Sequence, residues 1–160
     1  LRQSSPPSLA LGYLALRIVE AVFCSVIIIF PLALLALSQE ALLPAAAFST
    51  LSALAIAARA SVTGVLIPVF FGAGALCLYT SAYQSGLLPR PLAAWGLTGA
   101  VLILASTLLQ LLNPELSISL QMALALPMIT NEIFLGFWLL AKGFKTRAAA
   151  PGMAWQTSLP

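Results

Sequence analysis

Charged residues and histidine are what this 160-residue sequence has least of. Only 7% of its residues are charged and 61% are hydrophobic, whereas a soluble domain carries about 25% charged residues. Histidine is absent, and the two cysteines, Cys24 and Cys77, lie far apart in the sequence. The common transition-metal sites therefore cannot be assembled, and no metal or other cofactor is expected. These shortages exclude a soluble, disordered, nucleic-acid-binding or disulfide-stapled protein.

The sequence also lacks the arrangements on which many enzymes depend. A Ser-His-Asp set cannot form without histidine, and neither a glycine-rich phosphate loop nor a metal-ligand spacing occurs. We therefore predict that the protein is not an enzyme.

Long apolar runs are what the sequence has in abundance. A helix rises about 1.5 Å per residue, so about 20 apolar residues cross the roughly 30 Å of hydrocarbon in a bilayer. The runs do not alternate polar with apolar residues, which excludes β-strands. We predict an all-α bundle of four transmembrane helices, at 9–37, 61–83, 91–112 and 118–141.

Residues 38–60 are apolar, but the part from 44 to 58 is too short to cross a membrane alone. We predict a helix that lies at the membrane interface or leads into the second span, with Pro44 near its first turn. Residues 1–147 then form one transmembrane domain. The tail at 148–160, rich in Ala and Pro, is expected to be disordered.

Basic residues gather on one side of these four spans. Five of the seven fall on the side of the two termini: Arg2, Arg90, Lys142, Lys145 and Arg147. The other side has Glu40, Glu115 and one basic residue, Arg59. Because positively charged loops stay in the cytoplasm, we predict that both termini are cytoplasmic and that the protein lies in the inner (plasma) membrane. An interfacial belt of aromatic residues is expected on the same side, formed by Tyr13, Tyr79, Tyr83, Trp95 and Trp138.

Two of the spans carry polar residues that are costly inside a bilayer. Arg17 and Glu20 lie on one face of the first span, and Asn131 and Glu132 lie in the middle of the fourth. The depths of these residues overlap when each residue counts for about 1.5 Å. A tight bundle would therefore bring Arg17, Glu20 and Glu132 together near the membrane centre.

This cluster has three interpretations. It is structural, with an arginine neutralised by carboxylates and an asparagine to hold two helices in register. Alternatively, it forms a polar cavity that binds a substrate or passes a proton. In the third interpretation, Arg17 reaches the lipid headgroups unaided. One arginine facing two carboxylates leaves a surplus negative charge, so we predict that one carboxylate is protonated.

A stripe of small residues follows the second span. Gly64, Pro68 and Gly72 recur at four-residue spacing, and Gly96 and Ala100 form a matching stripe on the third span. Such stripes let helix backbones approach closely in lipid. The stripe packs either within one chain or against a second subunit, so the partners to consider are the lipid bilayer, a second copy and another membrane protein.

Three blocks of the sequence form a recognisable set: GYLALRIVEA at 12–21, SGLLPRPLAAWGL at 85–97 and LPMITNEIFLGFWLLAKGF at 126–144. Together they resemble a bacterial multi-pass membrane family known as domain of unknown function 4386. The positions that recur in the family fall on Tyr13, Arg17, Glu20, Pro89, Arg90, Pro127, Glu132, Trp138 and Lys142. The resemblance implies a membrane helix bundle and brings no established activity.

Two departures from the family pattern stand out. Family members usually have two further spans upstream, and this chain begins with leucine instead of methionine, so we expect it to be the C-terminal part of a longer protein. Many members also carry the residues HDW near the start of the second span, where this chain reads RAS at 59–61. An activity that depended on that patch would be altered here.

The sequence thus favours an integral membrane protein that binds a small or lipidic ligand, or a partner, around Arg17, Glu20 and Glu132. One alternative is a secondary transporter coupled to protons through Glu132 or Glu20. Another is a structural membrane subunit or scaffold in which the same polar cluster only holds the bundle together.

Overall fold

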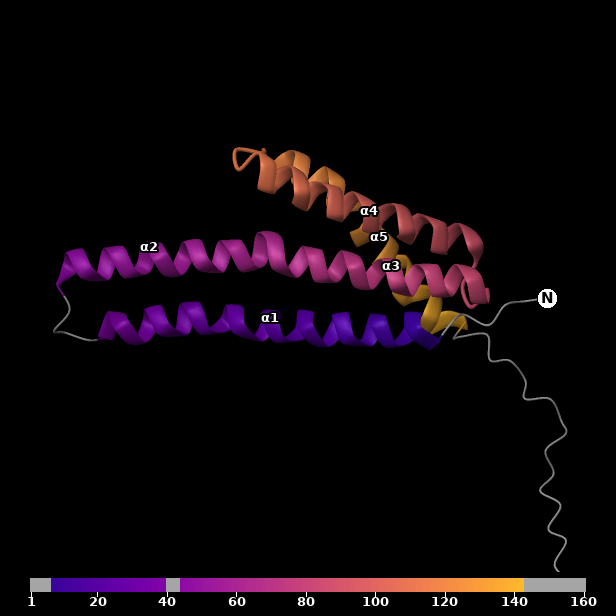
Figure 1. Cartoon of the computed structure of the whole chain (residues 1–160), viewed down its shortest axis with the longest axis horizontal. Helices are drawn as coiled ribbons and strands as arrows, with labels where there is room; N and C mark the ends of the chain where they lie inside the picture. The colour runs from indigo at the N-terminus through magenta and orange to yellow at the C-terminus, as the bar shows by residue number, and fades with distance from the viewer. Residues whose placement is uncertain (1–6, 40–43, 143–160) are drawn as a thin grey trace, which may run out of the picture.

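The computed structural model describes residues 7–39 and 44–142 of the chain, and all the regular structure in these ranges is helical (Figure 1). In chain order the elements are α1 (Pro7–Gln39), α2 (Ala45–Ser61), the π-helix η1 (Val62–Leu66), α3 (Ile67–Ser85), α4 (Arg90–Leu112) and α5 (Ile118–Lys142). The predicted disordered tail lies outside the described residues, as do Arg2, Glu40, Lys145 and Arg147.

Within the described ranges, four helices are long and apolar enough to cross a membrane: Ser8–Gln39, Ala45–Ser85, Arg90–Leu112 and Ile118–Lys142. The prediction of an all-α bundle with four spans is therefore confirmed. The chain is a multi-pass membrane protein, and many of its large apolar side chains are exposed because lipid takes the place of water around it.

The second of these helices is much longer than the predicted span. Helices α2, η1 and α3 follow one another without a break over 41 residues, so residues 45–60 lead directly into the second span. The helix starts at Pro44, whose carbonyl accepts hydrogen bonds from the N–H groups of Ala47 and Phe48. At about 1.5 Å per residue the helix is roughly 61 Å long. Its α2 end therefore extends with α1 past the turn between α4 and α5 (Figure 1).

Pro68 does not end this helix, and the local geometry explains why. Proline has no N–H to donate and its ring crowds the carbonyl one turn earlier. The helix widens just before it into η1, where the N–H of Ile67 bonds to the carbonyl of Val62. A π turn of this kind accommodates the proline, so the chain continues in the same direction.

Short turns join the remaining helices. Helix α3 ends at Gly86, whose φ of 66° belongs to the left-handed region that favours glycine. Pro89 then caps α4, and Pro91 occupies the first turn of that helix, where a missing N–H costs nothing. Between α4 and α5 the N–H of Leu116 bonds to the carbonyl of Asn113 at 3.1 Å.

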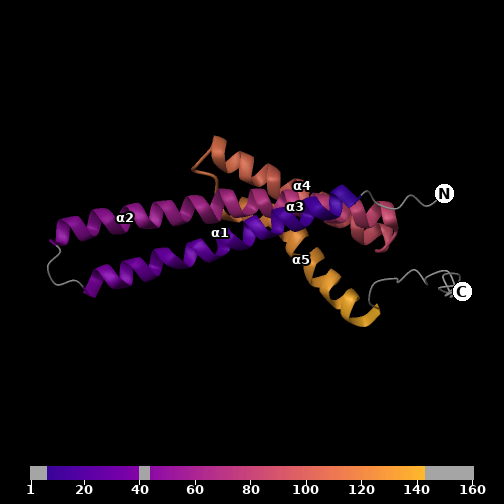
Figure 2. The ribbon, with the colours of Figure 1, turned by 60° about the horizontal axis from the view of Figure 1, so that its bottom comes forward.

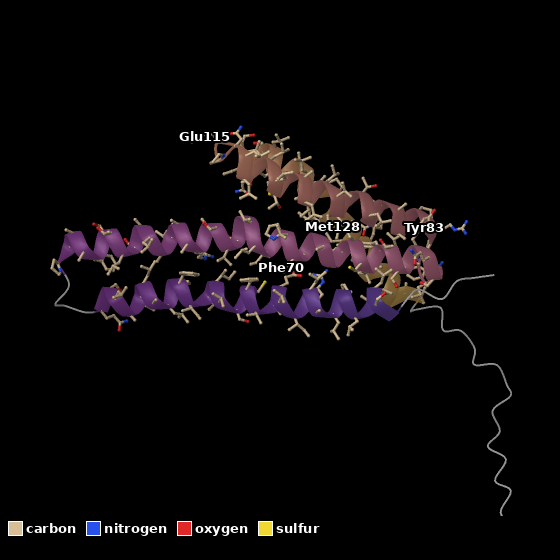
Figure 3. The ribbon with its side chains drawn as sticks, in the orientation of Figure 1. Phe70, Tyr83, Glu115 and Met128 are labelled. Atoms are coloured by element: carbon tan, nitrogen blue, oxygen red, sulfur yellow. The ribbon has the colours of Figure 1, made fainter. Side chains whose placement is uncertain are left out.

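The helices pack in a series: α1 lies on α3, α3 on α4, and α4 on α5. Figure 2 shows α5 leaving the bundle at an angle to the others. On the α1 side, the rings of Phe23 and Phe70 stack with their centroids 5.4 Å apart, and Figure 3 shows Phe70 on the side of α3 that faces α1.

The core lies where α3, α4 and α5 meet, and small residues bring these helices close together. A Cβ added at Gly72 would come within 2.8 Å of the Leu104 side chain, and one at Gly96 would overlap the ring of Tyr79. A Cβ added at Gly99 would lie 3.0 Å from the backbone of Met128. The residues Ala75, Ala93 and Ala100 are completely buried in this core. Gly72, Gly96 and Ala100 therefore lie at contacts within one chain.

Candidate functional site

Arg17 of α1 is the centre of a charged cluster inside the bundle. Its Nη1 atom lies 2.8 Å from Oε2 of Glu20 on the same helix, and its Nη2 atom lies 3.6 Å from Oε1 of Glu132 on α5. The structure thus brings together these three predicted residues, although Glu132 lies more than 100 positions after the other two in the sequence.

Helix α3 forms the floor beneath the guanidinium of Arg17. A Cβ added at Gly74 would lie 3.9 Å from Nε of Arg17 and 3.9 Å from the ring of Tyr13, so α3 passes within van der Waals contact of both side chains. The guanidinium carbon lies 4.7 Å from the ring centroid of Phe71 and 5.4 Å from that of Tyr13. Aromatic faces attract a cation, and these two rings help to hold Arg17 at this depth.

The cluster is open on the side of α5. The side chain of Glu20 is 14% exposed and that of Arg17 is 27% exposed, whereas that of Glu132 is 43% exposed. The Nε atom of Arg17 is buried and has no hydrogen-bond partner among the described residues. A charged side chain uncovered in the middle of a span is costly unless something polar covers it.

The contact between Arg17 and Glu132 bridges two helices that do not otherwise pack together. In the described ranges α1 packs on α2, η1 and α3, while α5 packs on α4. A charge-assisted hydrogen bond between a guanidinium and a carboxylate measures about 2.7–2.9 Å. The distance of 3.6 Å between Nη2 of Arg17 and Oε1 of Glu132 is longer, so Glu132 is incompletely paired. The α1–α5 gap therefore contains one arginine between a tightly held carboxylate and a loosely held one.

Tyr79 borders this cluster from the core, which corrects its predicted place in an interfacial belt. Its side chain is 1% exposed because the ring fills the space that Gly96 leaves on α4. Its hydroxyl has no hydrogen-bond partner among the described residues, and Arg17 and Glu132 lie within electrostatic range of it.

Asn131 lies away from the charged cluster, although it precedes Glu132 in the sequence. It is completely buried and donates a hydrogen bond from Nδ2 to the carbonyl of Leu92 on α4, at 3.1 Å. Asn131 therefore ties α5 to α4 and does not neutralise Arg17. The side chains of adjacent residues on a helix point about 100° apart, and the close α4–α5 contact at Gly99 and Met128 sets which of them faces α4.

The stripe of small residues on the second span divides between two environments. Gly72 faces Leu104 in the core, while Gly64 and Pro68 line a pocket together with Gln110 of α4. The sequence analysis did not single out Gln110 as a site residue and missed this pocket. No group of three potential metal ligands occurs among the described residues.

Comparison with known proteins identifies a family for most of the chain. The family model described as "Domain of unknown function (DUF4386)" matches residues 1–143, which include all the described helices and nearly all of the three recognised sequence blocks. No curated protein and no solved structure matches the chain. The chain therefore belongs to the DUF4386 family of multi-pass membrane proteins.

Proposed function

We propose that this chain is a non-enzymatic integral membrane protein that binds a small or lipidic ligand between α1 and α5. The observation that carries the proposal is the incomplete pairing of Glu132, which lies 3.6 Å from Arg17 and is 43% exposed inside a span. A purely structural ion pair in lipid is expected to be short and covered, because an uncovered charge has no water to solvate it.

The charges of the site indicate the kind of ligand. Arg17 carries one positive charge, and Glu20 and Glu132 together supply two carboxylates, so a negative charge is in surplus. A cationic group would balance it beside Glu132, and the exposed apolar side chain of Ile129, three residues earlier on the same face of α5, would contact a hydrocarbon chain. An amphiphile with an ammonium group fits this description.

Proton-coupled secondary transport is the second candidate, and the packing of α5 favours it. This helix carries Glu132, contains Pro127 within its length, and packs on α4 alone among the described helices. A helix attached along one side can move relative to the others, and a proton would balance the surplus charge as a cationic ligand does. In this case Glu132 or Glu20 carries the proton.

The proposed orientation places both termini in the cytoplasm and the chain in the inner membrane of a bacterium. Arg90 begins α4 and Lys142 ends α5, so these basic residues lie at the same end of the four-span bundle. Glu115 lies in the turn at the other end. This distribution supports the proposal, because positively charged ends of spans stay on the cytoplasmic side.

The ligand proposal is tested by native mass spectrometry of the protein released from a mild detergent. We expect one bound molecule of fixed mass on the wild type, and none on the Glu132→Gln variant. Glu115→Gln is the matched control, because it removes the same charge in an exposed turn and should keep the bound molecule. Octylammonium added to the stripped protein should bind with the same dependence on Glu132.

Identical spectra for the three proteins, with no octylammonium bound to any of them, would contradict the ligand proposal. Two further measurements then separate the alternatives. Proton flux into proteoliposomes that is lost in Glu132→Gln, with thermal stability kept, would support transport. Lower thermal stability of Glu132→Gln without any flux would support a scaffold.

A further inference from the structure

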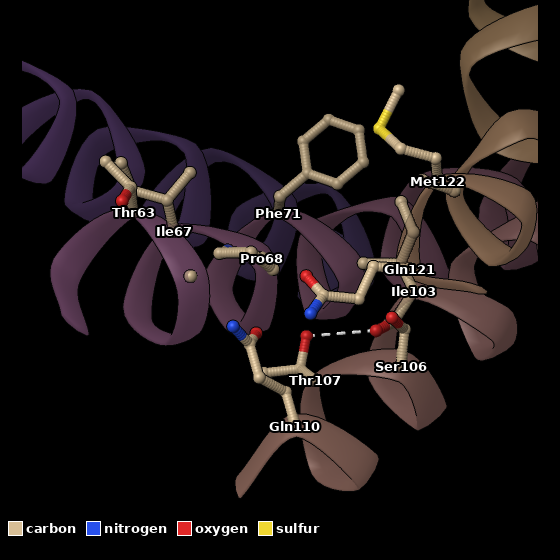
Figure 4. Close-up of a pocket in the computed structure, with 12 residues that line it drawn as sticks. Thr63, Ile67, Pro68, Phe71, Ile103, Ser106, Thr107, Gln110, Gln121 and Met122 are labelled. Atoms are coloured by element: carbon tan, nitrogen blue, oxygen red, sulfur yellow. Dashed lines mark hydrogen bonds between the residues drawn. The ribbon is translucent and has the colours of Figure 1, made fainter. Parts of the chain in front are cut away.

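A second polar site lies where the start of α3 meets α4 and α5. It is a pocket of about 280 Å³ between η1 with the start of α3, the C-terminal half of α4 and the start of α5. Apolar walls are provided by side chains that include Pro68, Phe71 and Met122. Figure 4 shows the amides of Gln110 and Gln121 turned into the space beside Pro68.

The polar groups of this pocket are all uncharged. Hydroxyl and amide side chains reach it from three segments, and these are Thr63, Ser106, Thr107, Gln110 and Gln121. Among the described residues, no charged side chain lines the pocket, in contrast with the cluster around Arg17. The residues of α4 recur at three- and four-residue spacing, so they form one polar stripe along that helix.

Some of these groups already have partners, and others do not. The hydroxyls of Thr63 and Thr107 donate to carbonyls of their own helices, at 3.0 and 2.9 Å, and Nε2 of Gln121 donates to the carbonyl of Leu116 at 3.1 Å. In the part of the chain that is described, Gln110 and Ser106 make no side-chain hydrogen bond, and Oε1 of Gln121 accepts none. The amide of Gln110, the hydroxyl of Ser106 and the Oε1 atom of Gln121 can therefore form hydrogen bonds with a ligand.

The irregular turn beside the pocket keeps the amide of Gln110 in place. A Cβ added at Gly64 would lie 3.1 Å from Nε2 of Gln110, so the glycine lets the amide lie against the backbone of η1. Pro68 follows this turn and also lines the pocket. Such π turns occur frequently at functional sites.

The pocket lies near the ends of two spans, at the level where the glycerol groups of membrane lipids are expected. Gln110 lies in the last turn of α4 and Gln121 in the first turn of α5, so both are close to the end of their spans. The ester and glycerol groups of lipids lie at this level, between the hydrocarbon and the headgroups. The pocket volume is slightly below the roughly 300–1,000 Å³ of pockets for drug-sized molecules. A pocket of this size can hold the polar head of a lipid but not the whole molecule.

We propose that this pocket binds an uncharged amphiphile whose hydroxyl and ester groups pair with Gln110, Ser106 and Gln121. The free hydroxyls would donate to Oε1 of Gln121 and of Gln110, and the ester carbonyl would accept from Nε2 of Gln110 or the hydroxyl of Ser106. The same chemistry occurs in an acylglycerol from the membrane and in a free polyol such as glycerol. This site is independent of the ligand proposed for the charged cluster.

The test measures the binding of 1-octanoylglycerol to the full chain in lauryldimethylamine oxide, a detergent without hydroxyl groups. Native mass spectrometry should show one molecule bound per chain, with affinity at least tenfold lower for Gln110→Leu. Gln84→Leu is the matched control, since this exposed glutamine lies at the far end of α3 and its loss should change nothing. Octylammonium and octanoate have the same chain length and should not compete for the site.

Ser106→Ala provides a second variant that removes one hydroxyl and keeps the helix intact, and we expect it to weaken binding severalfold. Binding of glycerol that depends on Gln110 in the same way would support the pocket and identify a free polyol as the source. Equal affinity of octanoylglycerol for the wild type, Gln110→Leu and Ser106→Ala would overturn the proposal. Displacement by octylammonium would also overturn it.

Discussion

The bundle holds two polar sites of opposite character, and Phe71 of α3 lies between them. Its ring faces the guanidinium of Arg17 at 4.7 Å on one side, and it lines the pocket of Gln110 on the other. The first site joins full charges across a gap between α1 and α5. The second gathers neutral amides and hydroxyls where η1, α4 and α5 meet.

The difference shows two ways of keeping polar groups inside a membrane. Charges need each other, so Arg17 is held by Glu20 and drawn toward Glu132 even though their helices do not pack. Several neutral polar groups form hydrogen bonds to backbone carbonyls of their own helices, as the hydroxyls of Thr63 and Thr107 do. Only the polar groups without such a partner are left for a ligand in the pocket. We therefore expect a charged ligand at the first site and an uncharged one at the second.

Both sites depend on the core of α3, α4 and α5, and breaking that core should have the largest effect. We expect Gly96→Ala to lower the free energy of unfolding by about 1–3 kcal/mol, because the new methyl group overlaps the ring of Tyr79. Gly136→Ala is the control, since nothing lies within 4 Å of a Cβ there. Unfolding by sodium dodecyl sulfate, followed by circular dichroism, measures both. Equal stability of the two variants would show that the Tyr79 contact is absent.

The pairing of charges at the first site is broken by Arg17→Gln, which leaves Glu20 and Glu132 without a counter-charge. We expect lower stability, and partial recovery when Glu132→Gln is added, with a coupling of about 0.5–3 kcal/mol in a double-mutant cycle. Arg90→Gln, in the exposed first turn of α4, should show no coupling to Glu132→Gln. A coupling of zero for Arg17 would mean that the 3.6 Å contact has no energetic weight.

Phe71→Leu tests whether the two sites share a wall. Losing a cation–π contact of about 0.5–1 kcal/mol and part of the apolar wall should weaken binding of octylammonium and of octanoylglycerol, each by about two- to fivefold. Phe70→Leu is the control, because Phe70 is directed at Phe23 of α1 instead. Isothermal titration calorimetry measures the four affinities. A change at one site only would show that Phe71 serves that site alone.

Asn131→Leu should have the smallest effect, because Asn131 belongs to neither site. It removes the hydrogen bond to the carbonyl of Leu92, which should cost about 0.6 kcal/mol of stability. The affinities for both probes should stay within twofold of the wild type. A loss of octylammonium binding would instead place Asn131 with Arg17.

The sequence was sufficient to predict the four helices long enough to span a membrane and the contact between Arg17 and Glu132. Span positions follow from runs of apolar residues, and depth follows from the rise per residue, since neither depends on how a helix is rotated. The rotation of α5 about its own axis could not be predicted in this way. It is set by the fit of Gly99 against Met128, and it turns Asn131 away from the cluster.

The pocket was beyond prediction, and the continuous second helix was predicted only as one of two alternatives, for related reasons. Gln110 and Gln121 lie on either side of the short turn between α4 and α5, and the rotation of each helix decides whether their amides face Pro68. Pro68 suggests a break in a helix, yet the π turn at 62–66 absorbs it and lets α2 continue into α3. Both outcomes depend on contacts between helices that a single sequence does not display.

The most direct test of the account is to measure both probes on both single variants, Glu132→Gln and Gln110→Leu, by native mass spectrometry in the same detergent. We predict that Glu132→Gln loses octylammonium and keeps octanoylglycerol, and that Gln110→Leu does the reverse. If either variant lost both probes while remaining folded, or if neither lost any, the description of two separate sites of opposite character would be contradicted.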